Sequence, residues 1–165
     1  MMSSSTSTLF AAGIAAGIAA TLTMDLLSAR ARKIGIISGV DGRWVGRWYL
    51  GIASGVFVHR DIAAYPDQPG EGRAALIGHY IIGVALAIVY VFGARWLTLP
   101  PDSAIVAIGY GLATCVFPWF MVLPALGFGA FGLRGPDEMK LFRTSVFSHL
   151  FYGLGLWWTC WVLGI

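Results

Sequence analysis

The chain has 165 residues, of which 58% are hydrophobic and only 12% are charged. Soluble domains carry about 25% charged residues, so this composition excludes an ordinary soluble domain and indicates a membrane protein. The net charge of +3 does not indicate a nucleic-acid partner, because the basic residues lie in loops beside long apolar runs, as the positive-inside rule describes for membrane proteins.

Four apolar runs are long enough to cross a bilayer, which takes roughly 20 helical residues each. They lie at residues 8–27, 74–96, 103–123 and 143–163. Met1 to Thr8 lacks the basic region of a secretory signal peptide, so we expect the first run to be a membrane helix. Four antiparallel helices joined in this way predict an all-α, integral membrane four-helix bundle, with residues 1–165 forming a single transmembrane domain.

The distribution of Lys and Arg residues predicts the orientation of the chain. Of the eleven Lys and Arg residues, ten lie in or beside loops 28–73 and 124–142, and only Arg95 lies on the other side of the predicted spans. Loops rich in Lys and Arg stay in the cytoplasm. Both loops are therefore predicted to be cytoplasmic, and both termini are predicted to face outward.

The segment Asp41–Gly55 in the first loop is too short and too charged to cross a membrane. A helical wheel places its tryptophans on one ridge and Arg43 and Arg47 on the neighbouring ridge. This pattern predicts an interfacial amphipathic helix on the inner leaflet. A re-entrant segment over residues 49–58 is the alternative.

The third apolar run contains Pro118 and is followed closely by Pro124 and several glycines. Proline removes a backbone hydrogen bond and kinks a helix. Two interpretations stay open: a bent helix that leaves the membrane, or a broken helix that exposes backbone carbonyls to a cavity.

The two cysteines, Cys115 and Cys160, both lie inside apolar runs. Neither has a second Cys or a His at metal-ligand spacing, and a disulfide between them is not expected. We expect both to be buried as small apolar side chains.

Three ionisable residues lie inside the predicted spans: Asp25, His79 and His149. At 1.5 Å per residue, all three fall within roughly 10 Å of the cytoplasmic edge. Each shares a helical ridge with small residues, which favour close contact between membrane helices. We therefore expect the three side chains to converge in one layer of the bundle.

The first loop can close over this layer with three further polar side chains, Arg47, His59 and Glu71, and the third loop can add Glu138. The resulting polar pocket would open to the cytoplasm. The predicted ligand-binding residues are Asp25, Arg47, His59, Glu71, His79 and His149.

Several kinds of chemistry stay open for this pocket. His79, His149 and Asp25 could supply two imidazoles and a carboxylate to a divalent metal. An arginine beside a histidine could instead hold a phosphate or carboxylate head group, and a layer of carboxylate and histidine could relay protons. A purely structural polar network is the remaining alternative. The sequence holds no HExxH, Cys-cluster or nucleotide motif, and it does not decide whether the protein is an enzyme.

Motifs in a fixed order along nearly the whole chain carry a family resemblance. They are Thr23-Met24-Asp25, Gly46-Arg47-Trp48, Gly55-x-Phe57-x-His59, Glu71, His79-Tyr80-x-x-Gly83, Trp96-Leu97, Pro124-Ala125-Leu126-Gly127-x-Gly129 and Ser148-His149-x-x-Tyr152-Gly153-x-Gly155-Leu156. The chain resembles a bacterial inner-membrane family known as domain of unknown function 2938. The resemblance implies a small four-helix protein of the bacterial inner membrane and implies no activity. In that membrane, the orientation predicted from the Lys and Arg residues puts both termini in the periplasm. The third loop departs from the family's Thr-Pro-x-Pro-like element, reading Leu133-Arg-Gly-Pro-Asp-Glu138, so the resemblance does not support a role for Glu138.

The leading functional prediction is a protein that binds or transports a small anionic molecule or a lipid head group. In this prediction Arg47 neutralises the anion, while Asp25, His79 and His149 couple protonation to binding, because histidine titrates near neutral pH. One alternative is a membrane metalloenzyme with a His and carboxylate site, and another is an accessory subunit of a larger membrane complex. The expected partners are membrane lipids, a small anionic ligand, and a second copy of the chain or a larger membrane complex, with no nucleic acid.

Overall fold

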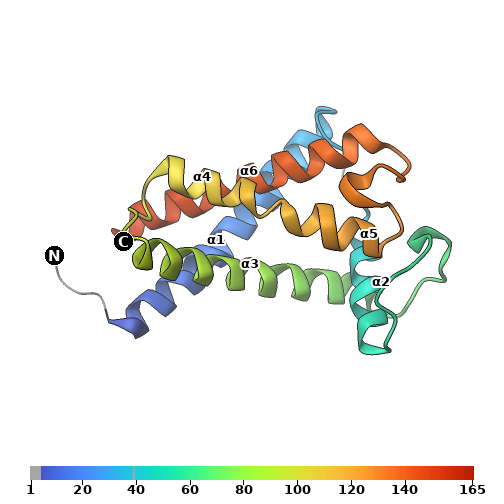
Figure 1. The fold of residues 1–165 in the computed structure, drawn as a ribbon, viewed down its shortest axis with the longest axis horizontal. Helices are drawn as coiled ribbons and strands as arrows, with labels where there is room; N and C mark the ends of the chain where they lie inside the picture. Colours follow the sequence, from blue (N-terminus) through green and yellow to red (C-terminus); the bar gives the residue numbers. More distant parts are fainter. Residues whose placement is uncertain (1–4, 39) are drawn as a thin grey trace. The chain divides into compact units, whose positions relative to one another are not determined.

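The computed structural model describes residues 5–38 and 40–165, and the side chain of Glu138 lies outside that description. All regular elements in this part of the chain are helical, which confirms the all-α prediction (Figure 1). In chain order they are α1 (Thr6–Lys33), α2 (Gly42–Ala53), η1 (Ile62–Ala64), α3 (Glu71–Trp96), α4 (Ala104–Ala113), η2 (Pro118–Val122), α5 (Leu123–Ala125), η3 (Ala130–Gly132) and α6 (Glu138–Leu163).

Four helices are long and apolar enough to cross a membrane, as predicted. They cover Thr6–Lys33, Glu71–Trp96, Ala104–Ala125 and Met139–Leu163. The first helix continues six residues past the predicted run, to Lys33, because backbone hydrogen bonds extend a helix after its apolar side chains end. Its last turn carries Arg30, Arg32 and Lys33, and cations are favourable at a helix C-terminus.

The chain packs as two compact units, and each has its own interior. The first unit comprises Met1–Ala29, Tyr80–Ala113 and Ser148–Ile165, and the second comprises Arg30–His79 and Thr114–Phe147. The prediction that residues 1–165 form a single transmembrane domain stays a prediction.

Close contacts between small residues hold the first unit together. A Cβ added to Gly17 of α1 would lie 2.5 Å from the Cα of Val84 in α3. A Cβ added to Gly153 of α6 would lie 2.8 Å from the Cα of Ile108 in α4. Backbones that approach this closely leave no room for larger side chains, so the small-residue ridges do form helix contacts.

Tyrosine hydroxyls link the helices of the first unit through polar contacts. Tyr152 donates to the carbonyl of Gly83 at 2.6 Å, and Tyr110 donates to the carbonyl of Leu86 at 2.7 Å. Each bond gives a buried hydroxyl a partner and joins a second helix to α3.

The second unit is built around α2, η1 and the turn after α5. Its buried apolar residues include Trp48, Ile62 and Leu126. Two backbone hydrogen bonds join its two chain segments: the His59 N–H donates to the carbonyl of Ala125 at 2.8 Å, and the Ile62 N–H donates to that of Leu126 at 3.1 Å. These bonds join two separate segments and not successive turns of one helix. No periodic pattern of side chains therefore predicts them.

The predicted helix of the first loop is present as α2, with the Asp41 side chain accepting from the Arg43 N–H at its N-terminus. Trp48 is buried in the second unit, and Trp44 packs edge-on against Phe128 with ring centroids 5.7 Å apart. The tryptophan ridge of α2 therefore faces protein, and the location of this helix at the membrane interface stays a prediction.

The third span bends at its prolines. It remains helical to Ala125, and Pro118–Val122 form a π-helical turn. Proline cannot donate to the carbonyl of Thr114, which instead accepts from the Phe117 N–H at 3.1 Å. This local adjustment supports the interpretation as a bent helix.

Both cysteines are buried, as predicted. The thiol of Cys115 lies 3.6 Å from the carbonyl oxygen of Ser145, within the second unit.

Candidate functional site

Arg47 is the best-connected polar side chain of the second unit. It is only 2% exposed, and all five of its N–H donors are engaged. Glu71 accepts two of them, from Nε at 2.8 Å and from Nη2 at 3.2 Å. The carbonyls of Ile62 and Tyr65 accept at 3.1 and 2.5 Å, and the carboxylate of Asp67 accepts the fifth.

Gly46 makes this network possible. A Cβ at Gly46 would overlap the backbone carbonyl of Glu71 and would lie 2.8 Å from the nitrogen of Ala75. Glycine therefore lets α2 contact the first turn of α3. Glu71 also accepts from the N–H of Gln68 at 3.1 Å, which closes the turn before α3.

The electrostatics of the network follow from these contacts. The hydrogen bonds to Glu71 raise the pKa of Arg47 above its usual value, although burial acts in the opposite direction. The predicted contact of Arg47 with an external anion would have to displace one of these internal partners.

His59 packs beside the same network. Its side chain is 4% exposed, and its ring lies edge-on to Tyr65 with centroids 4.6 Å apart. Its Nδ1 atom is buried and has no hydrogen-bond partner in the described structure. Of the six predicted site residues, Arg47 and Glu71 are hydrogen-bonded to each other. His59 contacts the ring of Tyr65, whose backbone carbonyl accepts a hydrogen bond from Arg47.

The other three predicted residues lie in the spans. Asp25 accepts a hydrogen bond from the Tyr80 hydroxyl at 3.3 Å, within the first unit. The backbone carbonyl of His149 packs against Gly111 of α4, also within the first unit. His79 belongs to the second unit. The convergence of Asp25, His79 and His149 in one layer stays a prediction.

Across residues 5–38 and 40–165, no three His, Cys, Asp or Glu side chains form a group that could hold a metal ion. The metalloenzyme alternative stays a prediction from the sequence.

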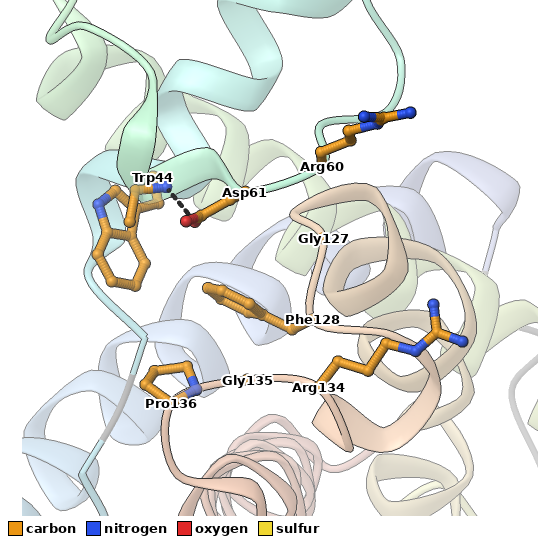
Figure 2. Close-up of a pocket in the computed structure, with 9 residues that line it drawn as sticks. Trp44, Arg60, Asp61, Gly127, Phe128, Arg134, Gly135 and Pro136 are labelled. Carbon is orange, nitrogen blue, oxygen red and sulfur yellow. Dashed lines mark hydrogen bonds between the residues drawn. The ribbon is translucent and has the colours of Figure 1, made fainter.

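A pocket of about 400 Å³ lies in the second unit, beside the Arg47 network. Figure 2 shows one wall formed by the chain around Arg60 and Asp61 and the other by the chain from Gly127 to Pro136. The lining residues are Trp44, Arg60, Asp61, Ala63, Gly127, Phe128, Arg134, Gly135 and Pro136.

Backbone geometry brings the two walls together. Gly127 has φ of +95°, and a Cβ there would overlap the carbonyl oxygen of Arg60 and lie 3.0 Å from the nitrogen of Asp61. Only glycine satisfies both the left-handed conformation and the close approach. The Asp61 carboxylate accepts from the Ala63 N–H at 3.0 Å, which starts η1 (Figure 2).

The lining of the pocket includes two arginines and two large aromatic side chains. In Figure 2 the Phe128 ring points into the space between the walls near Trp44, while Arg60 and Arg134 extend from opposite walls away from the aromatic end. Both arginines are exposed, and neither has a carboxylate within ion-pair distance among the side chains that the structure describes. The described lining of the pocket thus combines two arginines and the Asp61 carboxylate with aromatic side chains.

Sequence reasoning did not identify Arg60, Arg134, Trp44 or Phe128 as site residues. The two arginines entered only as evidence for topology. The only local indication was the glycine-rich stretch after Pro124. It indicates an unusual backbone conformation but does not indicate which segment packs against it.

Comparison with known proteins agrees with the resemblance seen in the sequence. Neither a curated protein nor a solved structure gives a match to the chain. The family model described as "Protein of unknown function (DUF2938)" matches residues 14–163. This range includes most of the first span, the other three spans and both long loops. The chain therefore belongs to the DUF2938 family.

Proposed function

We propose that this protein binds a small anionic molecule or a lipid head group in the pocket lined by Arg60 and Arg134. The observation that carries the proposal is the pair of exposed arginines at one aromatic-walled pocket, without a described carboxylate partner. Guanidinium groups bind phosphate and carboxylate oxygens through paired, charge-assisted hydrogen bonds. In this proposal the anion binds at the end of the pocket away from Trp44 and Phe128, toward which both arginines extend.

The size of the pocket narrows the ligand class. A volume of about 400 Å³ lies within the usual range for small-molecule sites and suits a head group, but not a complete two-chain lipid. If the ligand is a lipid, its acyl chains remain outside the pocket. Trp44 and Phe128 then contact the apolar part of the head group or its glycerol backbone.

Asp61 refines the expected chemistry. Its carboxylate also lines the pocket and already accepts the Ala63 N–H. A ligand with only negative charge would be repelled by it. The pocket therefore favours an anion that also carries a hydroxyl or ammonium group, which can donate to Asp61.

In this proposal the Arg47 network holds one wall of the pocket in position. Arg47 binds the carbonyl of Ile62, which directly follows the wall residue Asp61, and the carbonyl of Tyr65, which lies two residues after the wall residue Ala63. In this proposal Arg47, Glu71 and His59 position the wall, and Arg60 and Arg134 contact the ligand. The positive-inside rule places this part of the chain on the cytoplasmic side of a bacterial inner membrane, so the ligand would enter from the cytoplasm.

The test measures ligand affinity of purified protein in detergent. Inorganic phosphate is titrated in one arm, and short-chain phosphatidylglycerol and phosphatidylcholine are titrated in two others. Each charge-assisted bond contributes about 1.5–3 kcal/mol, so Arg60→Gln or Arg134→Gln should weaken anion binding about tenfold or more, and the double variant further.

Arg73→Gln is the matched control, because it removes an exposed positive charge at the first turn of α3, outside the pocket lining. Its affinity should stay within about twofold of the parent chain, as expected for a distant surface charge. Phosphate binding identifies a soluble anion, and selective phosphatidylglycerol binding identifies a lipid. Unchanged affinity in the folded double variant, or no binding in any arm, contradicts the proposal.

A further inference from the structure

Three consecutive apolar side chains project from the second unit in the loop between α2 and η1. Val56, Phe57 and Val58 are 40%, 63% and 68% exposed. Single exposed apolar residues are ordinary, but a contiguous apolar patch marks contact with a membrane or another molecule. These residues need a partner outside the described fold.

The loop is held in this outward arrangement by its backbone. The Val56 N–H donates to the carbonyl of Gly51 at 2.8 Å, and the indole N–H of Trp48 donates to the carbonyl of Phe57 at 2.8 Å. Gly55 makes the turn with φ of +83°. Because the polar backbone groups point inward to α2, the side chains point outward.

The helix before this loop, α2, packs against the N-terminal part of α3, an apolar helix that is long enough to span a membrane. Gly46 contacts the first turn of α3, and Tyr49 packs against Gly78. Gly78 lies seven residues beyond Glu71, or roughly 10 Å along the helix axis. Tyr49, in the second half of α2, therefore lies beside the first part of a helix that is long and apolar enough to span a membrane, and the loop of residues 56–58 follows α2 in the chain.

The charges around the loop favour a lipid surface over an apolar protein partner. Arg60 is exposed and lies two residues after Val58, whereas Arg43, at the start of α2, is paired with Asp41 at 3.4 Å. Exposed apolar residues beside a basic side chain are typical of segments that lie in the interface of anionic membranes. Trp48 is buried, so within residues 41–61 the exposed large apolar side chains are those of this loop and not those of the tryptophan ridge of α2.

We propose that residues 56–58 insert into the acyl region of the adjacent leaflet and anchor the second unit to an anionic bilayer. The occupant of this surface is lipid. The inserted side chains of residues 56–58 do not line the Arg60 and Arg134 pocket, and only Arg60 is shared between the two proposals.

Spin labelling in vesicles tests the proposal. The background carries Cys115→Ala and Cys160→Ala, and single cysteines are introduced as Phe57→Cys, Val58→Cys or, as a polar-loop control, Gln68→Cys. Each labelled protein is reconstituted in vesicles of phosphatidylethanolamine and phosphatidylglycerol. Collisions of the label with oxygen, which concentrates in the acyl region, are compared with collisions with a water-soluble nickel complex.

We expect oxygen collisions to exceed nickel collisions at positions 57 and 58, and the reverse order at position 68. All three native side chains are exposed, so labelling does not enter the protein core. Nickel collisions that dominate at 57 and 58 would overturn the proposal by placing the loop in water. Labels shielded from both reagents would also overturn it, because they would assign the patch to a protein contact.

Discussion

At the scale of single residues, Arg47 shows how one buried cation can organise a loop. Its five bonds join α2 to Glu71 at the start of α3, to the carboxylate of Asp67 and to the carbonyls of Ile62 and Tyr65. Buried ion pairs are costly to desolvate and become favourable only when the geometry satisfies every donor. Arg47 meets this condition, so its removal leaves buried acceptors without partners.

Arg47→Met should therefore destabilise the protein strongly. Removing one partner of a buried ion pair costs about 3–5 kcal/mol, because the other charge stays buried. Denaturant unfolding in detergent, followed by Trp fluorescence, measures the loss.

Arg47→Lys should lose less free energy of unfolding than Arg47→Met, because it keeps the charge but cannot reproduce the planar set of donors. The control is Arg73→Met, which removes an exposed arginine at the first turn of α3. Equal stability of Arg47→Met and the control would show that the network does not hold the second unit together.

The network around Arg47 illustrates what a residue pattern can and cannot predict. The sequence predicts that Arg47, His59 and Glu71 line one polar pocket, and that pocket stays a prediction. The sequence did not indicate that Arg47 and Glu71 bind each other, since pairing depends on the approach of α2 to α3 at Gly46. Sequence shows which side chains are polar, whereas the fold decides which donors remain available to a ligand.

At the scale of elements, the long helices were the most predictable part of the molecule. Their apolar length and small-residue ridges follow directly from composition and spacing, and the structure contains both. The pocket was not predictable in the same way. Its walls meet through backbone bonds from His59 to Ala125 and from Ile62 to Leu126, which leave no periodic trace in the side chains.

Gly127 is the residue on which the meeting of these walls depends. Gly127→Ala should destabilise the protein by about 1–3 kcal/mol for the left-handed backbone alone, with an added cost from the clash with Arg60. It should also weaken anion binding, because the wall that carries Arg60 must move. Thermal unfolding and phosphate titration measure the two effects.

Gly70→Ala is the matched control for this change. Gly70 has φ of +86°, but a Cβ there would have nothing within 4 Å. Gly70→Ala should lower the free energy of unfolding only by the conformational strain, and it should leave anion binding unchanged. Equal effects of the two substitutions on stability and binding would show that the close approach at Gly127 does not shape the pocket.

At the scale of the whole molecule, charge and packing are divided between the two units. All ten Lys and Arg residues of the predicted cytoplasmic side belong to the second unit, and only Arg95 belongs to the first. The first unit packs through glycine, alanine and tyrosine contacts, and the second through the Arg47 network and an aromatic core. This division supports a proposal in which the second unit recognises the ligand.

The most direct test of ligand recognition by the second unit is native mass spectrometry of the gently extracted protein. The parent chain is compared with the double variant Arg60→Gln/Arg134→Gln and with Arg73→Gln. The account predicts a bound anion or anionic lipid on the parent chain and on Arg73→Gln, and its loss from the double variant. An adduct of equal occupancy in all three proteins, or a bare chain in all three, would contradict the assignment of the pocket as the ligand site.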